Sequence, residues 1–216
     1  MTKDEYFSRG EISNSDLSWL KKYELQQSVI YDLEAAYRFG TLVDAIITEP
    51  EKVNYFNRTG EGEDYIFSEE EFGRAKKMHN AFRDDELCQH YLKQSTYQNV
   101  MSRVVTINHE GFEFEIPARC KWDIWMPKLV WGADIKSTTA TTQKQFEAAV
   151  RHFDYDRQRA WYMDIAGSDR DMLIGISKVN FQVFKVKITR DSELYQSGKK
   201  KYTALAFRFW TLFYNQ

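Results

Sequence analysis

The sequence has little cysteine, proline or glycine: two, three and ten residues, respectively, out of 216. Two distant cysteines, Cys88 and Cys120, are too few for a site built from four thiolates and favour a reducing, cytoplasmic setting. So few prolines and glycines exclude a collagen-like or low-complexity chain. No apolar run approaches the roughly 18 residues of a membrane span. Because residues 1–6 carry no cationic or apolar signal region, we expect no secretory leader.

Charge is almost balanced, with 30 basic and 32 acidic residues and a formal net charge of −2. This balance excludes a generally basic nucleic-acid binder but leaves room for a local basic groove around an acidic site. The high aromatic content, 16%, argues against disorder. We expect one domain over residues 1–216, with a mainly helical part at 1–95, a catalytic sheet with helices at 96–190, and a C-terminal helix at 191–216.

Helical patterns dominate the first part of the chain. Ser13 and its polar neighbours are typical of a helix cap, and a second helix is predicted over 31–48, ending before Pro50. Ser68, followed by three glutamates, predicts another helix start. The helical pattern then continues to about residue 93, with a break near Asp84.

Short runs rich in Val, Ile, Phe and Trp follow and predict strands. The expected strands are 101–107, 112–116, 118–125, 129–136, 172–178 and 182–188, the first four being successive and antiparallel. The expected helices are 143–152, 155–165 and 192–214, the last of them loosened at Gly198. This order predicts the α/β or α+β class, with a central mixed sheet flanked by helices.

Two carboxylates and a lysine are predicted to meet at one edge of this sheet. Asp123 comes near the end of one strand, and Asp134 and Lys136 share a face at the end of the next. Such a group suits Mg²⁺, with the lysine placed to orient a water and offset transition-state charge. Gly132, on the face of Asp134, would let a sugar-phosphate strand come close. An isolated Asp-x-Lys is more often an exposed ion pair, but the second aspartate and the apolar strands favour a site.

Two helical segments add polar groups to this set. Gln158 and Tyr162 are four residues apart and share a helix face, where they could hold a phosphate or a water. The alternative is a surface glutamine and a core tyrosine. Gly40 and Asp44 also share a face, so Asp44 is either a third acidic ligand or a solvated carboxylate.

Taken in order, these residues resemble the motifs of the PD-(D/E)xK nuclease superfamily, and within its RecB-type group the RecE, or exodeoxyribonuclease VIII, catalytic domain. The motifs are Gly40-x-x-x-Asp44, Asp123, Asp134-x-Lys136 and Gln158-x-x-x-Tyr162. Further similar segments, at 13–17, 39–50, 134–139, 155–158 and 198–202, extend the likeness over nearly the whole chain. The resemblance implies a restriction-endonuclease-like core.

The same resemblance implies an activity and its setting. The expected enzyme is a Mg²⁺-dependent exonuclease, with Mn²⁺ as a substitute, that degrades one strand of linear double-stranded DNA from the 5′ end. It would be encoded by a bacterium or phage and serve recombination or repair. Expected partners are DNA ends, a RecT-like single-strand annealing protein and, in a homo-oligomeric ring, further copies of the chain.

Roles follow by position in these motifs. Asp123, Asp134 and the backbone carbonyl of Ile135 would bind the metal. Lys136 would assist the nucleophile, and Gln158 and Tyr162 would support the site. The chain departs from the family at two positions: Asp44 replaces a common histidine and Trp122 replaces a proline. An aspartate still suits Mg²⁺, so Asp44 is kept as a ligand.

Nearby basic residues complete the expectations. Lys121, Arg157 and Arg159 are candidate DNA contacts, since phosphate contacts position nucleic acid. Two alternatives to the exonuclease stay open. One is an endonuclease of the same fold, of restriction or repair type, and the other is a catalytically silent DNA-binding subunit.

Overall fold

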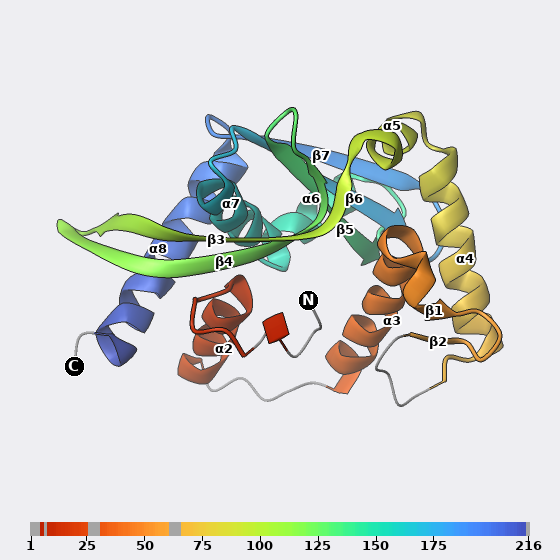
Figure 1. Ribbon diagram of the computed structural model, residues 1–216, viewed down its shortest axis with the longest axis horizontal. Helices are drawn as coiled ribbons and strands as arrows, with labels where there is room; N and C mark the ends of the chain where they lie inside the picture. Colours follow the sequence, from red (N-terminus) through yellow and green to blue (C-terminus); the bar gives the residue numbers. More distant parts are fainter. Residues whose placement is uncertain (1–4, 7, 26–30, 61–65, 215–216) are drawn as a thin grey trace.

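The computed structural model describes residues 5–6, 8–25, 31–60 and 66–214. Its centre is a five-stranded sheet in the order β3-β4-β5-β6-β7 (Figure 1). The strands are β1 (Val53–Asn54), β2 (Thr59–Gly60), β3 (Thr96–His109), β4 (Phe112–Met126), β5 (Trp131–Thr138), β6 (Arg170–Ser177) and β7 (Val183–Thr189). The helices are α2 (Asn14–Glu24), α3 (Tyr31–Thr48), η1 (Pro50–Lys52), α4 (Glu69–Asp84), α5 (Glu86–Gln94), α6 (Gln143–His152), α7 (Tyr155–Ala166) and α8 (Glu193–Phe213).

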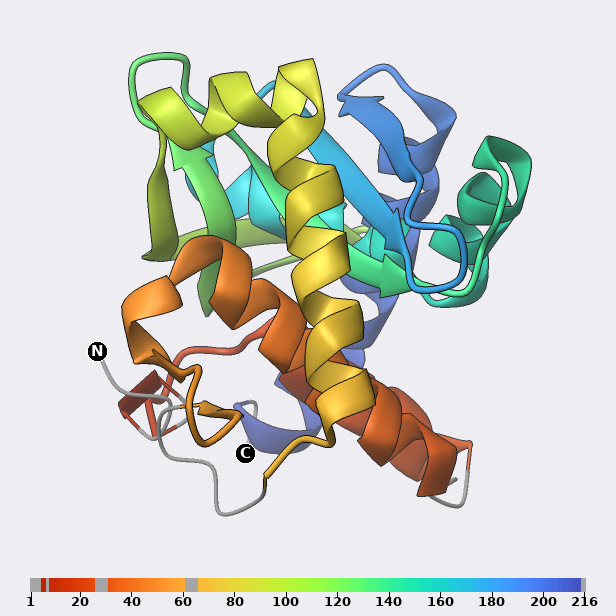
Figure 2. The same cartoon turned by 90° about the vertical axis from the view of Figure 1, so that its right-hand side faces the viewer.

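Helices cover both faces of the sheet, as Figure 2 shows for α3 and α4 in front and α8 behind. One apolar core joins the sheet to α3, α4 and α5, and a second joins it to α2, α6, α7 and α8. The β5–β6 pair is parallel and is connected through α6 and α7, whereas the other pairs are antiparallel. The expected mixed sheet flanked by helices is therefore confirmed. No helix in the described ranges is both long and apolar enough to cross a membrane.

Local signals set the ends of several helices. Ser13 and Ser68 each close a capping box, with Asp16 and Glu71 as the respective partners. Asp85 ends α4 and caps α5 by accepting a hydrogen bond from the Cys88 N–H. These contacts confirm the predicted helix starts and the predicted break after Asp84.

The expected strands 112–116 and 118–125 are in fact one strand, β4. Pro117, between them, does not interrupt it, because its carbonyl faces Ile12 and accepts the Ile12 N–H at 2.8 Å. The proline nitrogen lies on that same side, away from β3, so the missing N–H removes no hydrogen bond of the β3–β4 ladder. The resulting β3–β4 hairpin extends past the other strands (Figure 1).

The expected loosening at Gly198 is wrong, because α8 runs through it without a break. A Cβ at this position would lie 2.1 Å from the carbonyl oxygen of Asp156. The glycine therefore allows α8 to pack closely against the first turn of α7.

Alanine should act in opposite ways at two helical glycines. We expect Gly198→Ala to lower the free energy of unfolding by about 3 kcal/mol, because its methyl group meets backbone that cannot move aside. Gly73→Ala should raise it by about 0.5–1 kcal/mol, since a Cβ there meets nothing within 4 Å. Urea denaturation of both variants measures this, and equal shifts would contradict the close contact.

Candidate active site

A pocket of about 490 Å³ opens between α3, the ends of β4 and β5, and the start of α7. Every residue predicted as a catalytic group or metal ligand lines it: Asp44, Asp123, Asp134, Ile135, Lys136, Gln158 and Tyr162. The elements that supply them are far apart in sequence, so the fold creates this grouping. Gly40 lies on α3 beside β5, where an added Cβ would make an ordinary contact 3.5 Å from the Ser137 hydroxyl, so the packing of α3 on β5 does not require glycine there.

The carboxylates sit where two strands separate. β4 and β5 pair only from Met126 and Trp131 to Ile124 and Ala133. Asp123 and Asp134 are the next residues on each strand, and Asp123 accepts the Ile135 N–H at 2.7 Å in the opening. Because the N–H and C=O of a strand residue lie on one side of the strand, the Ile135 carbonyl faces the same opening.

Asp134 is almost fully buried and holds two cations. One oxygen accepts from Arg159 at 2.5 Å, and the other is 2.5 Å from the Lys136 ammonium. Lys136 also lies over the Tyr155 ring, 4.9 Å from its centre. Burial would lower the pKa of Lys136, but the charges of Asp134 and Asp123 outweigh burial and raise it. The lysine is therefore held as an ammonium beside the carboxylates.

The expected DNA contacts of Arg157 and Arg159 are wrong, because both side chains are buried. Arg159 bridges Asp134 and Asp171 and contacts the rings of Trp122 and Tyr162, with its guanidinium carbon 4.6 and 4.3 Å from their centres. Arg157 donates to Ser18 and Asn14 of α2 and so fastens that helix to α7. Both arginines therefore stabilise contacts inside the protein.

Lys121 remains a predicted DNA contact. It is only partly buried. Burial raises the pKa of Asp44, and the charge of Lys121 is one of the contributions that oppose this rise. Its ammonium group is therefore near the acidic pocket, and its contact with DNA stays a prediction.

Gln98 is a pocket-side residue that the sequence did not indicate. Its amide donates to Asp44 and to Thr48, each at 2.9 Å. It lies on β3 with a φ of 51°, between the ladder positions Tyr97 and Asn99. With this left-handed backbone, Gln98 is left out of the β3–β4 ladder, which no residue pattern in this segment predicts.

The negative charges of the pocket disfavour one another. Burial raises the pKa of Asp44 to about 6. The hydrogen bond from Gln98 opposes this rise, and the charge of Asp134 adds to it. Burial and the charges of Asp44 and Asp134 raise the pKa of Asp123 well above its usual range. A bound cation would relieve this repulsion.

Residues 19–205 match the family model described as a PDDEXK-like domain of unknown function (DUF3799). The chain belongs to this family. The expected superfamily is therefore confirmed for this PDDEXK-like domain. A comparison with curated protein sequences finds no match.

Three solved structures are similar to this PDDEXK-like domain. A phage related exonuclease from Haemophilus somnus 129PT is 13% identical, with a TM-score of 0.38 over 77% of this chain and 80% of that one. An alkaline exonuclease (LHK-Exo) from Laribacter hongkongensis is 13% identical, with a TM-score of 0.37 over 96% and 92%. SSO0001 is 12% identical, with a TM-score of 0.36; the match covers 53% of this chain and 50% of the SSO0001 chain.

The donor set of the PDDEXK-like domain suits a hard divalent cation. Asp44, Asp123 and Asp134 offer carboxylate oxygens, and Ile135 offers a carbonyl, which are the ligand types that Mg²⁺ takes. Within the described ranges, no three His, Cys, Asp or Glu side chains are already gathered as a metal cluster. Instead, the Lys136 ammonium neutralises one oxygen of Asp134. The residues fit the ion when the Lys136 ammonium moves away from this oxygen of Asp134.

Gly132 and Tyr162 have roles in packing. A Cβ on Gly132 would lie 2.4 Å from the Trp122 ring, so the glycine admits a core tryptophan rather than a sugar-phosphate strand. Tyr162 packs edge-on against Trp122, with ring centres 5.5 Å apart, and also lines the pocket. It is thus a core aromatic with one edge toward the site.

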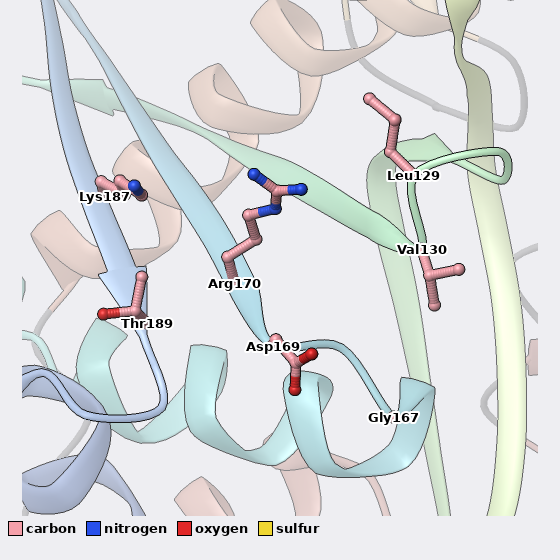
Figure 3. A pocket seen from close by; sticks show the side chains of 7 residues that line it. All are labelled: Leu129, Val130, Gly167, Asp169, Arg170, Lys187 and Thr189. Carbon is pink, nitrogen blue, oxygen red and sulfur yellow. The ribbon is translucent and has the colours of Figure 1, made fainter.

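A second pocket, of about 350 Å³, lies at the opposite end of the strands (Figure 3). Arg170 and Lys187 line it from β6 and β7, with Val130 and Asp169 from the neighbouring loops. None of the predicted site residues lines it. The candidate active site is therefore the pocket at the β4–β5 opening.

Proposed function

We propose that this protein is a divalent-metal-dependent DNA nuclease, and specifically a 5′→3′ exonuclease on linear double-stranded DNA. The observation that carries the proposal is the convergence of Asp123, Asp134 and Lys136 where β4 and β5 separate. Carboxylates beside an ammonium in a pocket open to solvent suit phosphodiester hydrolysis. Mg²⁺ is the proposed ion and Mn²⁺ its substitute.

Asp44, Asp123, Asp134 and the Ile135 carbonyl would hold the ion. When bound, it would polarise the phosphoryl oxygen and lower the pKa of a water. The Lys136 ammonium would donate hydrogen bonds to that water and to the phosphate, offsetting the charge that develops during attack. Gln158 would orient the water or the phosphate through its amide, and Tyr162 would hold the Arg159 side of the pocket in place.

End-labelled linear duplex and closed circular duplex, each with Mg²⁺, test the proposal. We expect stepwise release of nucleotides from the 5′ end of linear duplex, no loss of circular duplex, and no activity in EDTA. Cleavage of the circle would favour the endonuclease, and binding of duplex without cleavage in Mg²⁺ or Mn²⁺ would favour the silent subunit. Full activity in EDTA would contradict the metal requirement.

The proposal includes the setting that the motifs imply. It places the protein in the cytoplasm, encoded by a bacterium or phage, and acting in recombination or repair. A RecT-like annealing protein and a homo-oligomeric ring are its proposed partners. Co-purification with such an annealing protein and the mass of the native protein in solution test these two points.

A further inference from the structure

We propose that Lys178, Arg74 and Lys77 form a phosphate-binding track that leads the DNA backbone into the active-site pocket. The inference rests on the proposed function and deepens it, because it names the surface that the strand crosses before cleavage. The three residues come from the β6–β7 turn and from α4.

Lys178 connects the track to the pocket, which it lines together with Asp134 and Lys136. Its backbone N–H donates to the Thr138 carbonyl at 2.8 Å, so the turn is fixed to the end of β5. Its ammonium lies 5.7 Å from the centre of the Phe39 ring. In the described part of the chain, no ion pair neutralises Lys178, although it lies beside an acidic pocket.

A second cation lies next to Lys178. Arg74 is three residues before Lys77 on α4, and the Lys77 ammonium contacts Phe181 in the turn that carries Lys178. Burial and then the charge of Arg74 lower the pKa of Lys178, as expected for a positive group close to another. Arg74 pairs with Glu70 at 2.5 Å, but that glutamate is 80% exposed and the pair lies at the surface. Surface pairs of this kind are weak, so the guanidinium can exchange a carboxylate for a phosphate.

Lys77 extends the positive surface along α4. Residues three apart lie on one side of a helix, which places Lys77 beside Arg74. The Lys77 ammonium is 5.6 Å from the centre of the Phe181 ring, and Phe181 belongs to the same turn as Lys178. The serine that starts this turn, Ser177, accepts from the N–H groups of Val179 and Asn180, so the turn is held by its own hydrogen bonds.

Two neighbouring cations that repel each other gain most from an anion that binds both. The phosphodiester backbone offers one negative charge per nucleotide, and Lys and Arg are its usual partners. A chain of net charge −2 has no general attraction for DNA, so its binding of DNA would depend on local groups of cations such as this one. The geometry points to the strand that enters the pocket.

Binding of short fluorescent oligonucleotides in EDTA tests the track without cleavage. We expect the Lys77→Ala/Lys178→Ala double variant to bind at least about 10-fold more weakly than wild type, and its slope of log Kd against log salt to fall by about 1–2. Lys76→Ala is the matched control, since Lys76 is an exposed lysine on the same helix next to Lys77. It should change Kd by less than about 2-fold.

Circular dichroism confirms that the variants fold. Equal Kd values and salt slopes for the double variant and wild type would overturn the track, as would an equal loss in Lys76→Ala. Wild type that binds DNA through these lysines but cleaves nothing with Mg²⁺ or Mn²⁺ would retain the track and overturn the proposed nuclease. Cleavage by wild type together with unchanged binding by the double variant would overturn the track and retain the proposed nuclease.

Discussion

Lys136→Ala should reduce the rate of DNA cleavage at saturating Mg²⁺ by about 10²- to 10³-fold, the usual effect of removing a group that stabilises transition-state charge. Its ammonium is 2.5 Å from Asp134 and is kept charged by the carboxylates around it. Single-turnover cleavage of end-labelled duplex isolates the chemical step from binding and release.

The same variant should bind Mn²⁺ at least as tightly as wild type. Without the lysine, its ammonium no longer competes with the ion for the Asp134 oxygen that Arg159 does not hold. Calorimetric titration with Mn²⁺ measures this, and Lys128→Ala, in the exposed turn between β4 and β5, is the matched control for both readouts. Undiminished cleavage by Lys136→Ala would remove the lysine from the mechanism.

The group of Asp123, Asp134 and Lys136 could be predicted from local rules. Residues two apart on a strand share a face, and the strands expected at 118–125 and 129–136 are successive and antiparallel, which brings Asp123 near Asp134. The capping boxes at Ser13 and Ser68 are likewise short-range. These features depend on contacts within a hairpin or a helix turn, which residue order alone contains.

The supporting residues could not be predicted, because their roles depend on distant partners. Arg159 sits in a polar helical segment, where an arginine is normally exposed. Only the packing of α7 on the sheet buries it against Trp122 and Tyr162 and supplies Asp171 as its second partner. Gln98 is similar, since its contact with Asp44 joins β3 to α3.

Arg159→Met should be the most destabilising substitution near the site. It leaves the carboxylates of Asp134 and Asp171 buried, the latter without a cation, and breaking a buried ion pair in this way costs about 3–5 kcal/mol. Urea denaturation measures the loss. Arg208→Met, which breaks the surface pair with Glu24 at 2.7 Å, is the matched control and should cost less than about 1 kcal/mol.

The Asp171→Asn substitution tests whether the stability lost in Arg159→Met comes from buried charge or from lost packing. If the buried charge causes the effect, adding Asp171→Asn to Arg159→Met should restore part of the lost stability, because one of the two abandoned carboxylates becomes neutral. Strictly additive losses in the double variant would contradict this. Since Arg159 also holds one oxygen of Asp134, the rescued protein should still bind Mn²⁺ about 10-fold more weakly than wild type, as expected when a group that orients a metal ligand is lost.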